Sequence, residues 1–306
     1  MLINKNTCRI YPEFTDYLRA RFPAFKVQKI SLNAGFTCPN RDGSKGYGGC
    51  SYCNNRTFNP GYCDNSRSIT GQLQDGIRFF SRKYPDMKYI AYFQAYTNTY
   101  DKTANLRLKY EEALHNNDVV GIIIATRPDC VSGKLLDYLQ ELNRSTFVMV
   151  EYGIESTSDE TLRRINRGHT YEEAKTAVVR TAERQIPVGA HIILGLPGET
   201  DAQILRHAVT VSQLPLTSIK LHQLQIIRGT AMATEYESFP ERFRLFTVDE
   251  YIDLVAGFID RLRPDIHIDR FVSQSPKELL IAPDWGLKNH EFRARLEQSI
   301  SDKTKK

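Results

Sequence analysis

Four of the six cysteines lie close together, between positions 38 and 63. Cys38 and Cys50 are separated by eleven residues, and Cys50 and Cys53 by two. The segment between them is rich in Gly, Asn, Asp and Pro, which indicates a loop. A glycine-rich loop can bring backbone amides close to a metal centre. We therefore expect Cys38, Cys50 and Cys53 to bind metal.

The number of clustered cysteines bears on which metal they bind. A four-iron cubane takes about one thiolate per iron, so three cysteines leave one iron open to a cofactor or substrate. A closed zinc site needs four ligands, and Cys63 or a histidine would have to complete it. We favour the iron–sulfur cluster and keep zinc as the alternative. For Cys63 we favour an inert loop residue, and a fourth ligand or a redox thiol are the alternatives. Cys8 and Cys130 are interpreted as structural residues.

Short apolar segments alternate with longer amphipathic ones along most of the chain. Strands are predicted at 26–32, 88–96, 119–125, 146–154, 188–195 and 218–227. Helices are predicted at 69–84, 105–116, 133–143, 170–185 and 201–214. Thr170, followed by Glu173, is a predicted helix N-cap. This alternation predicts an α/β fold with a parallel sheet, whose site lies in loops at the carboxyl ends of the strands. The cysteine loop follows the first strand.

The alternation stops after residue 230, and this sets the expected domain boundaries. We divide the chain into an N-terminal segment (1–25), a core (26–230) and a C-terminal extension (231–306) packed on the core. The extension has a predicted helix at 248–262, then a loop with two prolines and a final charged helix.

Composition limits where the protein acts and what it binds. No apolar run approaches the roughly 18–20 residues that span a bilayer, and the N-terminus lacks the apolar core of a signal peptide. A cytoplasmic protein without membrane contact is expected. Clustered cysteines in that reducing compartment indicate metal binding instead of disulfides. The net charge of +5 permits an anionic partner such as RNA.

The segment CPNRDGSKGYGGCSYC resembles the cysteine loop of radical S-adenosylmethionine (radical SAM) enzymes. The usual gaps in that superfamily are three and two residues, and the longer first gap here resembles the branch related to the elongator catalytic subunit. The resemblance continues through YFQAYTNTY, ATRPDC, VEYGIES, INRGHT, HIILGLPGET, KLHQLQIIRGT and LIAPDW, in that order.

The resemblance implies a fold, cofactors and an activity. The fold would be a partial (β/α)6 barrel, and the cofactors a 4Fe–4S cluster and S-adenosylmethionine at the mouth of the barrel. Reductive cleavage would yield a 5′-deoxyadenosyl radical, with electrons from a reductase or a flavodoxin- or ferredoxin-type donor. The related branch suggests tRNA as substrate, at the wobble uridine. A small-molecule substrate, or a zinc-stabilised RNA-binding module without catalysis, remains an alternative.

Two charged residues at strand ends have both a functional and a structural interpretation. Glu151, Gly153 and Glu155 share one strand face, and the resemblance places Glu155 at the adenosyl ribose. The alternative is an ion pair with an arginine within 163–167. Arg127 is a candidate for the methionine carboxylate, or else it pairs with Asp129.

The resemblance suggests further cofactor contacts. Gln94, Thr97 and Asn98 stand where the superfamily holds the methionine amine, although its usual Gly-Gly-Glu is missing, and a simple turn is the alternative. Gly195 and Gly198 would place backbone against the adenine, or would form an ordinary packing turn.

Alternate positions of two strands carry His191, Lys220 and His222, which could face the barrel interior. Lys220 and His222 are the catalytic candidates, while a histidine with satisfied hydrogen bonds is the structural alternative. In the C-terminal part, Arg270, Asp284, Trp285 and Lys288 could close the mouth over the substrate, or Trp285 could be a packing anchor.

Overall fold

A single sheet of seven parallel strands forms the centre of the molecule. The computed structural model describes residues 10–57, 60–82 and 86–304. The strands follow in spatial order β1 (Val27–Leu32), β2 (Lys88–Phe93), β3 (Val119–Thr126), β4 (Phe147–Glu155), β5 (Val188–Leu194), β6 (Ser218–Gln223) and β8 (His267–Arg270). The six expected strands are therefore confirmed. The seventh, β8, was not expected.

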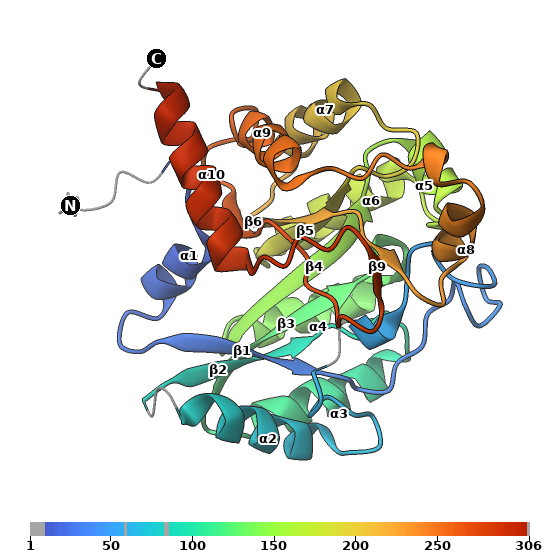
Figure 1. Ribbon diagram of the computed structural model, residues 1–306. Coiled ribbons are helices and arrows are strands. Elements are labelled where there is room, and N and C mark those ends of the chain that lie inside the picture. The colour runs from blue at the N-terminus through green and yellow to red at the C-terminus, as the bar shows by residue number, and fades with distance from the viewer. Residues whose placement is uncertain (1–9, 58–59, 83–85, 305–306) are drawn as a thin grey trace.

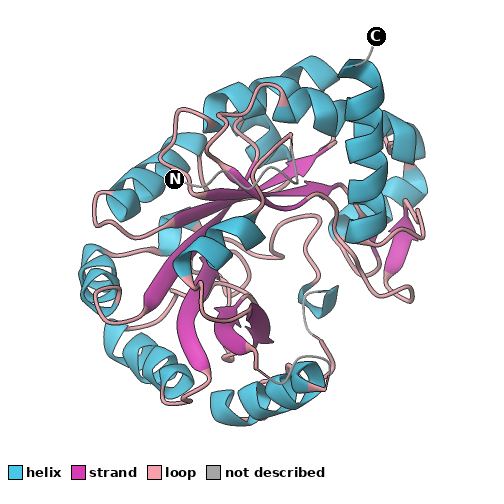
Figure 2. Cartoon of the chain, turned by 90° about the vertical axis from the view of Figure 1, so that its left-hand side faces the viewer, coloured by secondary structure: helices cyan, strands magenta, loops and turns pink. Residues whose placement is uncertain are grey.

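Helices cover the outer side of the curved sheet (Figures 1 and 2), except that α1 packs against inward-facing side chains. They are α1 (Phe14–Arg21), α2 (Ile69–Ser81), α3 (Thr103–Leu114), α4 (Gly133–Leu142), α5 (Asp159–Arg164), α6 (Tyr171–Ala182), α7 (Asp201–Val211), α8 (Ala231–Ser238), α9 (Val248–Ile259) and α10 (Asn289–Thr304). The α/β half-barrel expected from the sequence is confirmed. No helix of the described residues combines the length and apolar character needed to cross a membrane.

Three helices begin with a reciprocal cap that fixes where the preceding loop ends. The expected cap at Thr170 is confirmed: its hydroxyl accepts from the Glu173 amide, and the Glu173 side chain accepts from the Thr170 amide. The same arrangement starts α7 at Thr200 and α9 at Thr247. Each cap satisfies two amides that the helix itself leaves unpaired.

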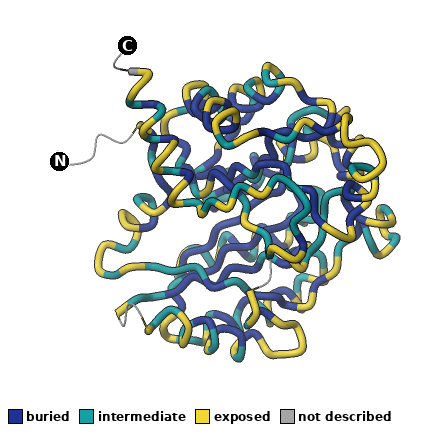
Figure 3. The backbone as a smooth tube through the Cα atoms, in the orientation of Figure 1, coloured by how far each residue is buried: buried dark blue, intermediate teal, exposed yellow. Residues whose placement is uncertain are grey.

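The two faces of each strand pack into different layers, as the period of two requires. Outward-facing side chains such as Ala91, Ile124 and Val148 join the main core beneath the helices. Inward-facing side chains at the amino ends of β2 to β4 form a smaller apolar cluster with Phe14 and Leu18 of α1. This cluster is the floor of the half-barrel. Most residues of β2 to β6 are buried, whereas those of the edge strands β1 and β8 are more exposed (Figure 3).

The C-terminal segment completes the same core. Strand β8 pairs with β6, while Phe258 of α9 and Phe292 of α10 belong to the main apolar cluster together with the sheet. A short antiparallel pair, β7 (Ile226–Ile227) and β9 (Leu280–Ala282), joins the two regions further.

The sheet does not close into a full barrel. Strands β1 and β8 are its two edges. Lys29 Nζ of β1 lies 2.5 Å from Asp269 Oδ2 of β8, so an ion pair crosses the gap between them. Helix α1 contacts β8 and adds Phe14, Thr15 and Leu18 to the wall of the interior.

Candidate active site

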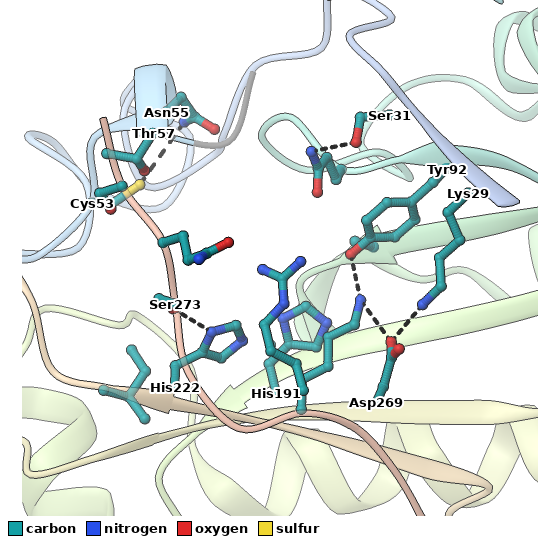
Figure 4. A pocket seen from close by; sticks show the side chains of 18 of the residues that line it. Lys29, Ser31, Cys53, Asn55, Thr57, Tyr92, His191, His222, Asp269 and Ser273 are labelled. Carbon is teal, nitrogen blue, oxygen red and sulfur yellow. Dashed lines mark hydrogen bonds and ion pairs between the residues drawn. The ribbon is translucent and has the colours of Figure 1, made fainter. Parts of the chain in front are cut away.

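The inner face of the sheet encloses a cavity of about 870 Å³. Cys38, Cys50 and Cys53 line one end of it. Figure 4 shows Cys53 at that end and Tyr92, Lys29 and Asp269 at the other. The cavity therefore joins a thiol-rich end to a charged interior.

Amide and guanidinium groups point at two of the three sulfur atoms. Asn40 Nδ2 lies 3.8 Å and Arg167 Nη1 3.5 Å from Cys50 Sγ, and Asn55 Nδ2 lies 3.9 Å from Cys53 Sγ. Donors to sulfur stabilise negative charge and tune iron–sulfur clusters. This donor set fits a thiolate-bound cluster.

The cysteine loop is also held in place by Arg41. Its Nη2 donates to the Cys53 carbonyl at 2.6 Å. Burial raises the pKa of the Cys53 thiol to about 11, even though the Arg41 guanidinium acts in the opposite direction. Metal binding at Cys53 must therefore displace a proton.

The remaining cysteines stand apart from this end of the cavity. Cys63 is buried, does not line the cavity, and its pKa is raised to about 12, first by burial. Burial likewise raises the pKa of Cys130 to about 12. These thiols stay protonated at neutral pH. Cys8 lies outside the described residues. Within those residues, no three His, Cys, Asp or Glu side chains are grouped to share one metal ion.

Arg127 forms the ion pair that the sequence offered as its structural role. Its Nε donates to Asp129 Oδ1 and its Nη2 donates to Asp129 Oδ2, each at 3.0 Å. The third nitrogen, Nη1, is buried without a partner among the described residues, and Arg127 lines the cavity. One donor therefore remains for a ligand.

Glu155 pairs with Arg167, one of the arginines expected for it. Their side chains are 3.5 Å apart, and both line the cavity. Gly153 makes room for this pair, because a Cβ there would lie 2.4 Å from Glu155 Oε1 and 2.6 Å from Arg167 Nη2. Arg167 thus links Glu155 to the Cys50 sulfur.

The three polar candidates after β2 separate in the structure. Gln94 donates to Ser31 Oγ at 2.8 Å and lines the cavity. Thr97 also lines it, with a buried hydroxyl that has no hydrogen-bond partner among the described residues. Asn98 does not line the cavity, and its Nδ2 instead donates to the Ala125 carbonyl at 2.7 Å.

Gly195 and Gly198 form the turn between β5 and α7 and do not line the cavity. Gly195 has a φ of +92°, and a Cβ there would lie 2.7 Å from the Phe246 ring. Close packing of this turn therefore requires glycine at 195.

Buried charged groups cross the interior of the half-barrel. Lys220 Nζ donates to Glu151 Oε2 at 2.6 Å and to the Tyr92 hydroxyl at 2.8 Å. His191 Nε2 lies 3.0 Å from the same carboxylate oxygen. Burial alone would raise the pKa of Glu151, but Lys220, His191 and Lys29 hold it well below the usual range. Glu151 therefore stays ionised and orients Lys220 and His191, both of which line the cavity.

His222 also faces the cavity, as alternation predicted. Its Nδ1 lies 2.5 Å from Ser273 Oγ, and its buried Nε2 has no partner within the described residues. Burial, followed by the nearby positive charges, lowers its pKa well below the usual range, so the ring is neutral at pH 7.

Sequence reasoning missed several members of the site. Asn40, Arg41, Lys29 and Asp269 were not singled out. The signal for Lys29 was a lysine inside an apolar strand. Trp285 is a packing residue: its Nε1 donates to the Phe246 carbonyl at 3.0 Å, and its ring packs on Phe292.

Family models match nearly the whole described chain. The Radical SAM superfamily model matches residues 36–211, and the Radical_SAM C-terminal domain model matches residues 216–302. Since the first match covers more than half of the chain, the protein belongs to the radical SAM superfamily. These enzymes bind a 4Fe–4S cluster and S-adenosylmethionine and need an electron donor.

Individual relatives extend this result. YtqA of Bacillus subtilis (strain 168) is 35% identical over 298 residues, which cover 97% of this chain and 92% of that protein. The tRNA uridine(34) acetyltransferase of Methanocaldococcus infernus is 26% identical over 141 residues, or 45% of this chain and 25% of that protein. The structure of Methanocaldococcus infernus Elp3 with an N-terminal deletion superposes with a TM-score of 0.68 at 15% identity, and the match covers 92% of this chain and 64% of that one. The last comparison concerns the fold.

Proposed function

We propose that this radical SAM enzyme modifies tRNA at the wobble uridine, with Cys38, Cys50 and Cys53 as ligands of its cluster. The observation that carries the proposal is one cavity that joins three cysteines to a buried, hydrogen-bonded set of charged side chains. Similarity to the tRNA uridine(34) acetyltransferase supports the choice of tRNA.

Cys38, Cys50 and Cys53 would hold the cluster, which together with S-adenosylmethionine would supply the chemistry of hydrogen-atom abstraction by a 5′-deoxyadenosyl radical. Residues of this chain would bind the cofactor and orient the substrate next to it. Arg127 Nη1 and the Thr97 hydroxyl are two of the buried polar atoms that have no hydrogen-bond partner among the described residues and belong to residues lining the cavity, and we assign these two to the cofactor. Gln94, Glu155, Asn98, Gly195 and Gly198 are kept as weaker candidates. Lys220 and His222, deeper in the cavity, are the catalytic candidates on the substrate side.

The test is a comparison of modified nucleosides in total tRNA from cells with and without this gene. The proposal expects at least one wobble-uridine nucleoside to be lost and a precursor or a less processed form to accumulate. Identical nucleoside profiles would reject tRNA as the substrate. Release of 5′-deoxyadenosine by dithionite-reduced protein tests the radical chemistry separately.

The cysteine assignment gives a direct prediction. Cys50→Ala should abolish the brown iron–sulfur absorbance and most of the bound iron after anaerobic reconstitution, because one of three ligands is lost. Cys63→Ala, the matched control, should keep both. One zinc and no iron in the wild-type protein would instead favour the zinc-stabilised module.

A small-molecule substrate is the second candidate. A cavity of about 870 Å³ falls within the size range of pockets for compact ligands, and the cofactor would occupy part of it. Unchanged tRNA together with continued 5′-deoxyadenosine release would favour this alternative.

The cellular setting is also part of the proposal. Free thiols grouped on a cluster-binding loop suit the reducing cytoplasm. A reductase, or a flavodoxin- or ferredoxin-type protein, would then donate the electron.

A further inference from the structure

We propose that Arg270 and His222 form a binding subsite for a compact oxyanion of the substrate, a carboxylate or a phosphate. This inference rests on the proposed function in placing substrate in the same cavity, and it adds the chemical class of the group that is recognised there.

The first observation is the pairing of charges in the interior. Each lysine has a carboxylate: Lys29 Nζ lies 2.5 Å from Asp269, and Lys220 Nζ lies 2.6 Å from Glu151. Arg270 lines the same cavity. Among the described residues it makes no hydrogen bond or ion pair, and the interior carboxylates of Asp269 and Glu151 are already engaged by lysine. Arg270, an exposed residue, thus lines the cavity without a carboxylate partner among the described residues.

A register shift in the pairing of β6 and β8 accounts for the position of Arg270. The shift falls between Ile219 and Lys220 and brings the Cα of Arg270 opposite that of Lys220, so that both Asp269 and Arg270 line the cavity. Burial is the main reason that the pKa of His222 is lowered, and the charge of Arg270 adds to this effect. Burial raises the pKa of Tyr92, and the charge of Arg270 opposes that rise. Arg270 is therefore close to the two rings that bound this part of the cavity.

His222 supplies the second, independent observation. The ring is neutral at pH 7 and carries one proton. Nδ1 lies 2.5 Å from Ser273 Oγ. We assign the tautomer in which the Ser273 hydroxyl donates to Nδ1, which puts the proton on Nε2, the buried atom without a partner in the described structure. A free N–H beside a free guanidinium is a donor set that fits an oxyanion. His191, whose ring centroid is 5.3 Å from that of His222, bounds the same space.

The experiment measures binding of inorganic phosphate and of acetate to the full-length, cluster-loaded protein. Saturating S-adenosylmethionine is present without reductant, so that the cofactor's own carboxylate site is filled. Titration calorimetry at low salt compares wild type with Arg270→Gln and His222→Gln. Arg206→Gln, on the exposed face of α7, is the charge-matched control.

The inference expects wild type and Arg206→Gln to bind at least one anion alike. Arg270→Gln should weaken that binding about tenfold or more, since a charge-assisted bond is lost. His222→Gln should weaken it by a smaller factor. Preference for phosphate or for acetate identifies the source of the oxyanion.

Two results would overturn the inference: no binding of either anion to wild type, or equal binding to wild type and Arg270→Gln. If Arg270→Gln does not fold, Arg270→Lys, which keeps the charge but loses the planar fork, carries the same comparison. Anion binding with unchanged tRNA nucleosides would reject the tRNA proposal alone, and altered tRNA without anion binding would reject the subsite alone.

Discussion

Glu151 is a buried carboxylate whose Oε2 accepts from Lys220, Tyr92 and His191. Replacing it with alanine would remove the carboxylate that lies 2.6 Å from the buried Lys220 ammonium. We expect Glu151→Ala to lower the free energy of unfolding by about 3–5 kcal/mol, the usual range for breaking a buried pair. Urea unfolding monitored by circular dichroism measures this change.

The control for this prediction is an exposed pair of the same kind. Glu141 and Arg144 form an ion pair at 2.5 Å on the surface of the molecule. Glu141→Ala should cost less than about 1 kcal/mol. A similar small effect for Glu151→Ala would contradict the view that the interior charges depend on each other.

Asp129 gives a prediction about acid stability. Burial alone would raise its pKa, but hydrogen bonds and charges from Arg127 and Lys45 lower it from 3.8 to about 2. A carboxylate whose pKa is lower in the folded than in the unfolded state stabilises the fold at pH values above the unfolded-state pKa. This stabilisation is lost as the pH falls toward the folded-state pKa. The contribution is about 2 kcal/mol by linkage.

Asp129→Asn should therefore be less stable at pH 7 and should show a flatter decline in stability between pH 4 and pH 2. Unfolding curves of iron-free protein measure this, because acid loss of a cluster then plays no part. Parallel declines in variant and wild type would show that the Arg127 pair does not stabilise the fold.

Strand alternation was enough to predict which face His191, Lys220 and His222 occupy, because their neighbours are apolar and the period of a strand is fixed. It could not predict the Lys29–Asp269 pair. Those residues lie 240 positions apart, and their contact depends on how far the sheet curls. The sequence likewise could not decide whether Arg127 and Glu155 form ion pairs or bind the cofactor, because both depend on which side chains the fold brings together.

At the scale of elements, β4 depends on a glycine near its end. Gly153→Ala would place a methyl group against Glu155 and Arg167, and we expect a cost of about 1–3 kcal/mol from overpacking. The shift of Arg167 should also weaken its contact with the Cys50 sulfur. Unfolding measurements and iron retention under chelator report the two effects.

Gly61→Ala is the matched control, because a Cβ there would contact nothing within 4 Å. It should leave stability and iron retention unchanged. If Gly153→Ala behaves in the same way, the close approach of Arg167 is not required.

Long periodic elements were predicted well, and short ones were not. Strands β1 to β6 and helices such as α6 have clear apolar periods and caps. Strand β8 has four residues, of which Ile268 alone is buried, so its pattern is too short to recognise. Its membership of the sheet depends on pairing with β6, which is a tertiary effect.

At the scale of the whole molecule, the expected C-terminal extension shares the core of the sheet. A chain ending at residue 246 would lose β8, α9 and α10, together with buried Phe258 and Phe292. It would also expose the edge of β6 to pairing with other chains. We expect no cooperative unfolding transition and strong aggregation, measured by thermal denaturation and size-exclusion chromatography. A soluble, cooperatively folding fragment would indicate two independent domains.

The gap between β1 and β8 has a mechanical consequence. Six ladders of backbone hydrogen bonds join the seven strands of the curved wall. Between the edge strands β1 and β8, the described residues have no such ladder, and the Lys29–Asp269 ion pair links the two strands instead. Parting one ion pair requires far less than unzipping a ladder of backbone bonds. We therefore expect the wall to open more easily at that side than between any two paired strands.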